Sequence, residues 1–408
     1  MRLEDIDLND SRRFVSGVPW EWFTYLRKEA PVYFHPHAES AGGGYWCVTR
    51  HEDCVNVNRD WEHFSSFEQG ALFHDMAPDA LEQQRLMMLN MDPPLHTRYR
   101  RLVNRGFTPR MVRDLEAKIV GYTDEIIDTV CEKGSADFVV EMAAELPLLV
   151  IAEIMGVPRE DRGQVFDWSN SMIGAEDPEY FVPPEEQGRA AMELYAYADQ
   201  LTAARRADPH EDLISVLTTA EVEGETLSQL EIDLFFLLLA VAGNETTRNL
   251  IAGGMTAFFE HPDQWQLLRS DRSLLPGAVE EMLRYVTPVM HFRRQVIADL
   301  TIGNQAVAAG DKVVFWHISA NRDEAVFERP NDFDITRDPN NHIAFGGGGP
   351  HFCLGANLAR LEIQVFFDRL VDRLPDISLD GPVERLQSNF INGTKHLPVA
   401  FTPSAPLR

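Results

Sequence analysis

The sequence predicts a mainly α-helical fold with small β-sheets at one side. From about Pro94 to Val286, apolar residues recur at helical spacing, whereas strand-like stretches occur only before and after this segment. No internal repeat, low-complexity tract or flexible linker divides the chain. Although a chain of 408 residues would allow about two or three domains by length, we therefore expect one domain, residues 1–408.

The composition limits the possible functions. Forty-four per cent of the residues are apolar, and 37 Lys and Arg stand against 64 Asp and Glu, a net charge of −27. We expect a large core and neither nucleic-acid binding nor attraction to anionic membranes. The longest strongly apolar run, Leu234 to Gly243, is too short for a membrane span, and Met1 to Asp10 lacks the features of a secretory signal. Four cysteines make no disulfide framework in this length, so a cytoplasmic location is expected.

The first elements are mixed. A helix is expected from Pro19 because Trp20, Phe23 and Leu26 fall on one side of it. The next expected elements are strands at 31–34 and 45–49 around a glycine-rich turn, and a helix at 52–59.

Long helices are expected in the middle, among them 115–130, 185–204 and 230–259. Ser228 and Glu231 form a capping-box signature for the start of the last one. Because this helix is apolar almost all round, it is expected to cross the core. Gly243 interrupts it at a cost of about 1 kcal/mol relative to alanine, so some feature of the fold must compensate.

The pattern changes after Thr287-Pro288. Strands are expected at 295–302, 306–309 and 312–316, then a helix at 356–374 and short strands within 389–401.

A glycine-rich loop precedes the last helix and ends in a cysteine: Phe345-Gly346-Gly347-Gly348-Gly349-Pro350-His351-Phe352-Cys353-Leu354-Gly355. A thiol at a helix start is favoured as thiolate by the helix dipole. It could be a nucleophile with His351 as base, an axial ligand of haem iron, or part of a plain turn. Structural zinc is disfavoured because no C-x-x-C or H-x-x-x-H spacing is present.

Three further motifs accompany this loop, in the order His96-Thr97-Arg98-Tyr99-Arg100, Ala242-Gly243-Asn244-Glu245-Thr246-Thr247 and Glu281-Met282-Leu283-Arg284. Together with the loop, they make the sequence resemble the cytochrome P450 family of haem-thiolate monooxygenases along essentially the whole chain. One departure is that Phe345 lies eight residues before Cys353, where seven is common. Members with this extra residue include actinobacterial lipid and sterol hydroxylases.

The resemblance implies a role for each motif. Cys353 would be the iron ligand of haem b. Thr246 would hydrogen-bond bound dioxygen and Glu245 would help to deliver protons, beside a groove at Gly243. An ion pair of Glu245 with Arg248 is the competing interpretation for this carboxylate in the resting protein. The remaining cofactor-binding residues would be His96, Arg100, Gly243, Arg294, Phe345, His351 and Gly355, with the basic ones at the haem propionates.

Glu281, Arg284 and Arg337 are assigned a structural role. A Glu and an Arg three residues apart, together with a second arginine, are expected to make a buried ion network that fixes geometry.

The resemblance also implies a substrate cavity lined by 64–90, 166–181 and the residues Leu238, Val241, Ala242, Val289, Met290, Phe390 and Ile391. Because this lining is mainly apolar, it favours a large hydrophobic ligand, and we expect a sterol, a branched fatty acid or a terpenoid. The alternative is that these residues are simply core.

Electrons are expected from NAD(P)H through a separate ferredoxin reductase and ferredoxin. A local basic patch could dock the acidic ferredoxin, and it consists of Arg98, Arg100, Arg101, Arg105, Arg110 and Arg113. Three other functions remain as alternatives: a peroxide-driven peroxygenase, a non-catalytic haem sensor or carrier, and a cysteine-nucleophile hydrolase.

Overall fold

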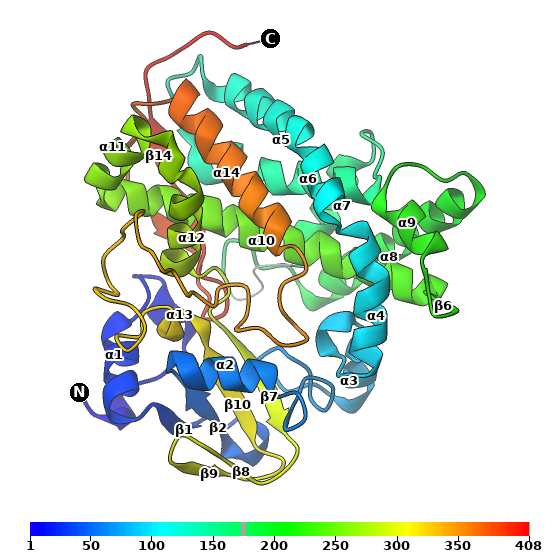
Figure 1. Cartoon of the computed structure of the whole chain (residues 1–408), viewed down its shortest axis with the longest axis vertical. Helices are drawn as coiled ribbons and strands as arrows, with labels where there is room; N and C mark the ends of the chain where they lie inside the picture. Colours follow the sequence, from blue (N-terminus) through cyan, green and yellow to red (C-terminus); the bar gives the residue numbers. More distant parts are fainter. Residues whose placement is uncertain (173–176, 408) are drawn as a thin grey trace.

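The computed structural model describes residues 1–172 and 177–407, and its fold is mainly helical with small β-sheets, as predicted. The helices are α1 (Trp20–Glu29), α2 (His51–Arg59), α3 (Pro78–Gln84), α4 (Leu95–Val103), α5 (Pro109–Val130), α6 (Glu145–Met155), α7 (Arg162–Ser171), α8 (Pro184–Ala207), α9 (Leu213–Thr219), α10 (Gln229–Glu260), α11 (Pro262–Ser270), α12 (Leu275–Val286), α13 (His317–Ala320) and α14 (Ala356–Arg373). The helices lie mostly in one half of the molecule, and the largest sheet lies in the other half (Figure 1).

The strands are β1 (Val32–Pro36), β2 (Gly44–Val48), β3 (Phe64–Ser65), β4 (Ser135–Asp137), β5 (Glu221–Val222), β6 (Glu225–Thr226), β7 (His291–Val296), β8 (Leu300–Ile302), β9 (Gln305–Val307), β10 (Lys312–Trp316), β11 (Ser378–Leu379), β12 (Glu384–Arg385), β13 (Thr394–His396) and β14 (Pro398–Ala400). The largest sheet has the order β1-β2-β10-β7-β3. Its pairs are antiparallel except β10 with β2, where Val313 lies opposite Trp46. Within the described residues, no helix is long and apolar enough to cross a membrane.

Helix α10 runs through the middle of the helical half (Figure 1). The predicted capping box begins it: the Ser228 hydroxyl accepts from the Glu231 backbone N–H at 3.2 Å, and Glu231 Oε2 accepts from the Ser228 backbone N–H at 2.7 Å. It is buried on several sides, because α6, α8 and α12 all pack against it. The prediction of a core-crossing helix at 230–259 is therefore confirmed.

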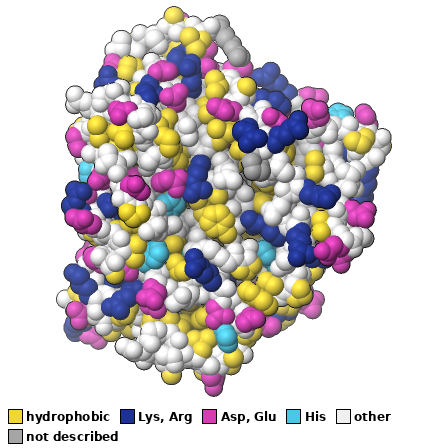
Figure 2. All heavy atoms as spheres, viewed as in Figure 1, with side chains coloured by type: hydrophobic (Ala, Val, Ile, Leu, Met, Phe, Trp, Pro, Cys, Tyr) yellow, Lys and Arg dark blue, Asp and Glu magenta, His cyan; other side chains and the backbone are white. Residues whose placement is uncertain are grey.

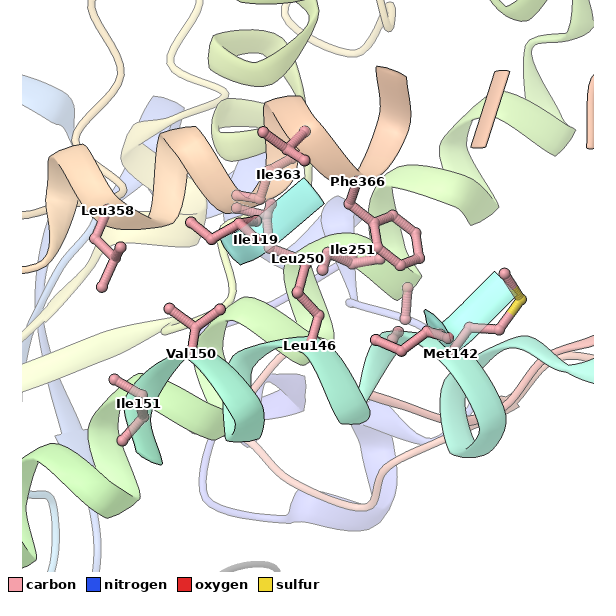
Figure 3. Close-up of a cluster of buried hydrophobic side chains, with 14 of the residues drawn as sticks. Ile119, Met142, Leu146, Val150, Ile151, Leu250, Ile251, Leu358, Ile363 and Phe366 are labelled. Carbon is pink, nitrogen blue, oxygen red and sulfur yellow. The ribbon is translucent and has the colours of Figure 1, made fainter. Parts of the chain in front are cut away.

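The packing around α10 explains why a glycine is tolerated at position 243. Side chains from α5, α6, α10 and α14 meet there, among them Ile119, Val150, Leu250 and Phe366 (Figure 3). A Cβ atom at Gly243 would lie 2.5 Å from Cδ1 of Ile151, so the missing side chain allows α6 to pack closely against α10. This close packing of α6 on α10 compensates for the low helix propensity of Gly243, as expected from the sequence.

One sequence prediction about a strand is wrong. The strand predicted at 295–302 is divided between β7 and β8, because β7 follows β10 across the sheet and the chain then leaves it at Ile297, which is 47% exposed. The middle segment, from about Pro94 to Val286, is mostly helical as predicted, and it also contains β4, which pairs with β14, and the hairpin β5–β6. These strands are two or three residues long, too short to leave an alternating pattern.

The glycine-rich loop approaches α2. A Cβ atom at Gly347 would lie 2.9 Å from the Cα of Val55, and one at Gly349 would lie 2.5 Å from the backbone oxygen of Asn58. Arg59 Nε also donates to the Gly347 carbonyl at 2.8 Å. The glycines therefore let a loop backbone pack directly on a helix backbone, which fixes the loop that carries Cys353.

We predict that Gly349→Ala destabilises the chain more than Gly310→Ala. Both glycines have positive φ, +79° and +92°, which costs an alanine about 1 kcal/mol. Only position 349 adds a collision with backbone, worth roughly 1–3 kcal/mol more, because a Cβ at 310 meets nothing within 4 Å. Denaturant midpoints of the two variants measure the difference, and equal midpoints would show that the contact with α2 contributes nothing.

Candidate active site

A largely apolar cavity lies between α10 and the cysteine loop. Of the residues singled out from the sequence, its wall brings together His96, Arg100, Leu238, Ala242, Gly243, Thr246, Val289, Arg294, Phe345, His351, Cys353 and Gly355. These residues come from α4, α10, the α12–β7 connection, β7 and the loop before α14, so segments up to 259 positions apart meet at one site. Leu250, Leu283, Leu354 and Leu358 add apolar wall.

Cys353 is placed three residues before α14 begins at Ala356, and its backbone N–H donates to the Phe345 carbonyl at 3.0 Å. Its accessible surface faces the cavity, because the residue is exposed and also lines the cavity wall. Burial from bulk solvent raises the pKa of the thiol, and a hydrogen bond from the Gly355 backbone and the charges of Arg100 and Arg360 oppose that rise. The helix start alone therefore does not decide the ionisation of the thiol, contrary to the expectation from the sequence.

The loop is also held from behind by charged groups. Arg360 lies over the Phe345 ring, 4.6 Å from its centroid, and its guanidinium donates to Glu280 at 2.6 and 2.9 Å. Burial alone would raise the pKa of Glu280, but hydrogen bonds from Arg360 and His342 lower this pKa to about 2. This carboxylate thus stays ionised and orients Arg360 behind the cysteine loop.

The nucleophile interpretation is not supported by the geometry. His351 makes its side-chain contacts elsewhere: Nε2 lies 3.3 Å from the Ser66 hydroxyl, and the ring lies 4.3 Å from that of His96. Among the described residues, no hydrogen bond joins His351 to Cys353. A base within hydrogen-bond reach of the sulfur is the requirement for such chemistry.

One edge of the cavity is basic. Burial lowers the pKa of Arg294 to about 10, and burial also lowers the pKa of Arg100. Burial and the neighbouring Arg100 lower the pKa of His96 to about 4, and burial, Arg294 and His96 also lower the pKa of His351. In the described part of the chain, neither Arg294 nor Arg100 forms an ion pair, and the Arg294 guanidinium donates to the Arg293 carbonyl at 2.7 Å. Buried cations without carboxylates are costly unless a guest supplies the anion.

This donor set fits an iron porphyrin. A porphyrin needs apolar walls for its ring, a ligand for its iron and cations for its two propionates, and guanidinium groups bind carboxylates in a bidentate manner. The cavity offers leucine-rich walls, one thiol at the wall and two unpaired arginines with two histidines at one edge.

Helix α10 carries the two residues predicted to supply protons, Glu245 and Thr246. Thr246 lines the cavity, and its hydroxyl donates to the Ala242 carbonyl at 2.9 Å, a contact that bends helices. Glu245 is buried and does not belong to the cavity wall as described. Arg248 lies 2.5 Å from its carboxylate, so the ion pair proposed as the competing interpretation is present.

The predicted substrate residues divide into two groups. Leu238, Ala242 and Val289 line the cavity, whereas Val241, Met290, Phe390 and Ile391 are not part of its described wall. The Met290 N–H donates to the Phe390 carbonyl at 2.8 Å, and Ile391 forms an isolated β-bridge with Val289. Met290 belongs to the core next to Trp316. Of the predicted segment 166–181, residues 173–176 lie outside the described residues.

The wall also contains residues that the sequence did not suggest, among them Asn58, Phe292, His317 and Glu362. Strand alternation could have indicated Phe292, because it lies two residues before Arg294 on β7. Helical spacing from Gly355, seven residues earlier, could have indicated Glu362 on α14. Asn58 and His317 come from α2 and α13 without a local motif, so only the tertiary structure reveals them.

The predicted ion network around Glu281 is confirmed. The Glu281 carboxylate accepts from Arg284 at 2.7 and 2.8 Å and from Arg337 at 3.1 Å, and Asn340 and the Asp334 backbone N–H complete its shell. Both Glu281 and Arg284 are fully buried. Arg284 also donates to carbonyls of the segment 321–332, which ties α12 to the chain that leads to the cysteine loop.

Fold and site together define a haem-thiolate oxygenase: a thiol and a basic edge on one wall of an apolar cavity, and a helix with an acid-alcohol pair on another. Comparison with known proteins leads to the same class. The family model for cytochrome P450 matches residues 188–375. A steroid C26-monooxygenase of Rhodococcus jostii (strain RHA1) is 43% identical over 405 residues, which is 98% of this chain and 85% of the relative. A methyl-branched lipid omega-hydroxylase of Mycobacterium tuberculosis (strain ATCC 25618 / H37Rv) is 42% identical over 388 residues, 93% of this chain and 90% of the relative.

Solved structures agree. A Mycobacterium marinum cytochrome P450 in complex with pseudoionone has a TM-score of 0.89 and 39% identity, with 96% of this chain and 97% of that chain covered. A Bacillus megaterium cytochrome P450 in complex with testosterone has a TM-score of 0.84 and 35% identity, with 94% and 99% covered. The chain therefore belongs to the cytochrome P450 family, whose cofactor is haem, and it is a monooxygenase that acts on hydrophobic substrates.

We predict that Arg294→Gln weakens haem binding and stabilises the haem-free chain. The variant loses a charge-assisted contact, which corresponds to about tenfold faster transfer of haem to apomyoglobin. It also removes a buried cation that forms no ion pair within the described residues, so the thermal unfolding temperature of the haem-free chain rises. Arg105→Gln, at an exposed arginine, is the control and leaves both measurements unchanged. Haem loss equal in the two variants would contradict the role of Arg294.

Proposed function

We propose that this monooxygenase hydroxylates a steroid or a methyl-branched lipid, using the cavity between α10 and the cysteine loop. The observation that carries the proposal is the placement of Cys353 in an apolar cavity that Thr246 also lines, beside arginines without an anion. Similarity supports the substrate class, because relatives above 40% identity are a steroid C26-monooxygenase and a methyl-branched lipid omega-hydroxylase.

Haem would be held by residues of α4, β7, α10 and the loop before α14 in this proposal. Cys353 would supply the thiolate ligand of the iron, while His96 and Arg100 of α4, Arg294 of β7 and His351 would receive the propionates. Phe345, Gly355 and Gly243, which line the cavity, would contact the porphyrin. Thiolate-ligated haem supplies the activation of O₂ and the cleavage of its O–O bond.

The substrate is positioned by apolar side chains. Leu238 and Ala242 of α10 and Val289 after α12 form the described part of the wall, and the assignments of Val241, Met290, Phe390 and Ile391 remain predictions. Pseudoionone is a branched isoprenoid ketone and testosterone a steroid, so two structural neighbours accept ligands of the shapes proposed for this chain. A cavity of this kind binds by burial of apolar area rather than by specific hydrogen bonds.

Proton supply is assigned to Glu245 and Thr246. The Thr246 hydroxyl, which donates to the Ala242 carbonyl, is a group of α10 that can present a proton inside the cavity. Glu245, the preceding residue, is buried and forms an ion pair with Arg248. We assign Thr246 to hydrogen bonding at the reacting oxygen and Glu245 to proton delivery toward Thr246.

Electrons come from NAD(P)H through a ferredoxin reductase and a ferredoxin in this proposal. The predicted basic patch is smaller in the structure, because Arg98 pairs with Glu225 and Glu231 and Arg100 lines the cavity. Arg105 and Arg113 are exposed and make no ion pair within the described residues. Figure 2 shows basic side chains around exposed hydrophobic ones on the face that carries α4 and α5 in Figure 1. An acidic ferredoxin would be attracted to such a surface.

We predict that testosterone or pseudoionone converts the ferric protein from low to high spin, and that oxygenated products form with a surrogate ferredoxin, its reductase and NADPH. A large apolar ligand that displaces water from the iron produces this spectral change. The variant Cys353→Ala tests the assignment of Cys353 as the iron ligand. The carbon monoxide difference band that the wild type shows must be absent from this variant. If steroids, branched lipids and terpenoids all give neither a shift nor a product, the substrate class is wrong, whereas an unchanged carbon monoxide band in the variant would refute the role of Cys353.

We predict that charge reversal at Arg105 or Arg113 slows reduction by an acidic plant-type ferredoxin about tenfold at low salt. The effect shrinks at high salt because surface charges are screened. Arg189→Glu, at an exposed arginine of α8 without an ion pair in the described chain, provides a charge-matched control. Equal rates for all three variants would rule out docking at this patch.

A further inference from the structure

We propose that Asn249 is a positioning residue for the Glu245 carboxylate and so controls how many of the consumed electrons end in product. The inference rests on the proposed proton-delivery role of Glu245. Asn249 lies one turn after Glu245 on α10, is 1% exposed and does not line the cavity as described. It therefore acts through Glu245 and touches neither the substrate nor the cofactor.

The amide of Asn249 has a fixed orientation. Its Oδ1 accepts from the Thr394 backbone N–H at 3.1 Å, and because a backbone N–H can only donate, the oxygen must face β13. Its Nδ2 then faces α10 and donates to the Glu245 carbonyl at 2.9 Å and to Glu245 Oε1 at 2.7 Å. Both N–H groups and one oxygen lone pair are used, so no other arrangement of this amide satisfies its neighbours.

The surroundings prevent the amide from moving. A Cβ atom at Gly393 would lie 2.9 Å from Asn249 Oδ1, so the chain before β13 approaches the amide oxygen closely. The carboxylate is consequently tied to the turn between β12 and β13, an element far along the sequence. Position 393 requires the absence of a side chain for this contact to form.

Arg248 and Asn249 make different contributions to Glu245. Arg248 compensates the charge, with its guanidinium 2.5 Å from the carboxylate, but its side chain is 17% exposed and its Nε has no partner in the described residues. Asn249 is neutral and fully anchored. Arg248 Nη2 lies 2.5 Å from each of the two carboxylate oxygens, although its contact with the buried Oε2 is an ion pair without hydrogen-bond geometry. Asn249 donates to Oε1 alone and, being anchored at β13, fixes where that oxygen lies.

The position of the Glu245 carboxylate is expected to decide whether the protons consumed in the reaction form water or hydrogen peroxide. Hydroxylation consumes O₂, two electrons and two protons and yields hydroxylated product and water, whereas misdirected protonation releases the same electrons and protons with O₂ as hydrogen peroxide. If Asn249 aims the carboxylate, its loss raises the yield of peroxide at the expense of product without changing substrate binding. This separates a positioning role from a merely structural one.

The experiment compares Asn249→Leu, which removes the amide at similar volume, with Asn249→Asp, which keeps an acceptor for Thr394. Peroxide per NADPH is measured with a surrogate ferredoxin and testosterone, or pseudoionone if testosterone gives no spectral shift. We expect an approximately tenfold rise in the ratio of peroxide to product in both variants, with the dissociation constant from the spectral shift unchanged. Thr256→Val, which loses a hydroxyl contact to Ala252 on the same helix, is the control and shows no rise.

A double-mutant cycle with Glu245→Gln decides the route. If Asn249 acts through Glu245, adding Asn249→Leu to Glu245→Gln causes no further rise, and additive effects would overturn the proposal. A normal peroxide ratio in both Asn249 variants, while Glu245→Gln uncouples, would also overturn it. If Glu245→Gln itself leaves the ratio unchanged, the proposed function of Glu245 fails instead. Should Asn249→Leu not fold, Asn249→Asp carries the same cycle.

Discussion

Two guanidinium groups without an ion pair in the described chain, the buried Arg294 and the partly buried Arg100, are the constraint on which the site depends. Arg294 and Arg100 face an apolar cavity, and no ion pair compensates them within the described chain. Such an arrangement costs stability in the protein alone, and the cost is recovered only when a guest brings carboxylates. A dianionic flat ligand with a metal for the nearby thiol meets this requirement, so charge, shape and ligand chemistry all select the same cofactor.

The scaffold around the cavity serves to hold one loop in place. The glycine segment fits against α2, Arg360 and Glu280 hold the Phe345 ring, and the Glu281 network fixes the chain that enters the loop. These contacts come from opposite sides and use different interactions: backbone packing, a cation over a ring and a buried ion network. In the proposed role of Cys353 as iron ligand, the sulfur would tolerate little movement, and the buried polar groups around the loop restrict it.

Much of this could be predicted from the sequence because the decisive signals are local. The capping box of α10, the pairing of β1 with β2 and the four motifs at the cavity each depend on residues close together in the chain. The failures have the opposite character. Met290 belongs to the same core cluster as Trp316, β7 ends where it loses its partner β10, and Asn58 enters the wall from a helix without a motif. Each of these outcomes depends on contacts between distant segments, which a single sequence does not display.

Helix α10 contains a residue, Gly243, that is unfavourable in a helix but allows a neighbouring helix to pack closely. Gly243 weakens the helix, yet the space it leaves is taken by Ile151 on the core side, while Thr246 takes the Ala242 carbonyl as acceptor along the cavity wall. Between these positions Glu245 turns away from the cavity toward Arg248 and Asn249. An apolar ligand can therefore occupy the cavity without meeting a bare carboxylate, although the acid lies next in sequence to the Thr246 hydroxyl. The separation of apolar binding from acid chemistry across one helix reconciles a hydrophobic substrate with a reaction that consumes protons.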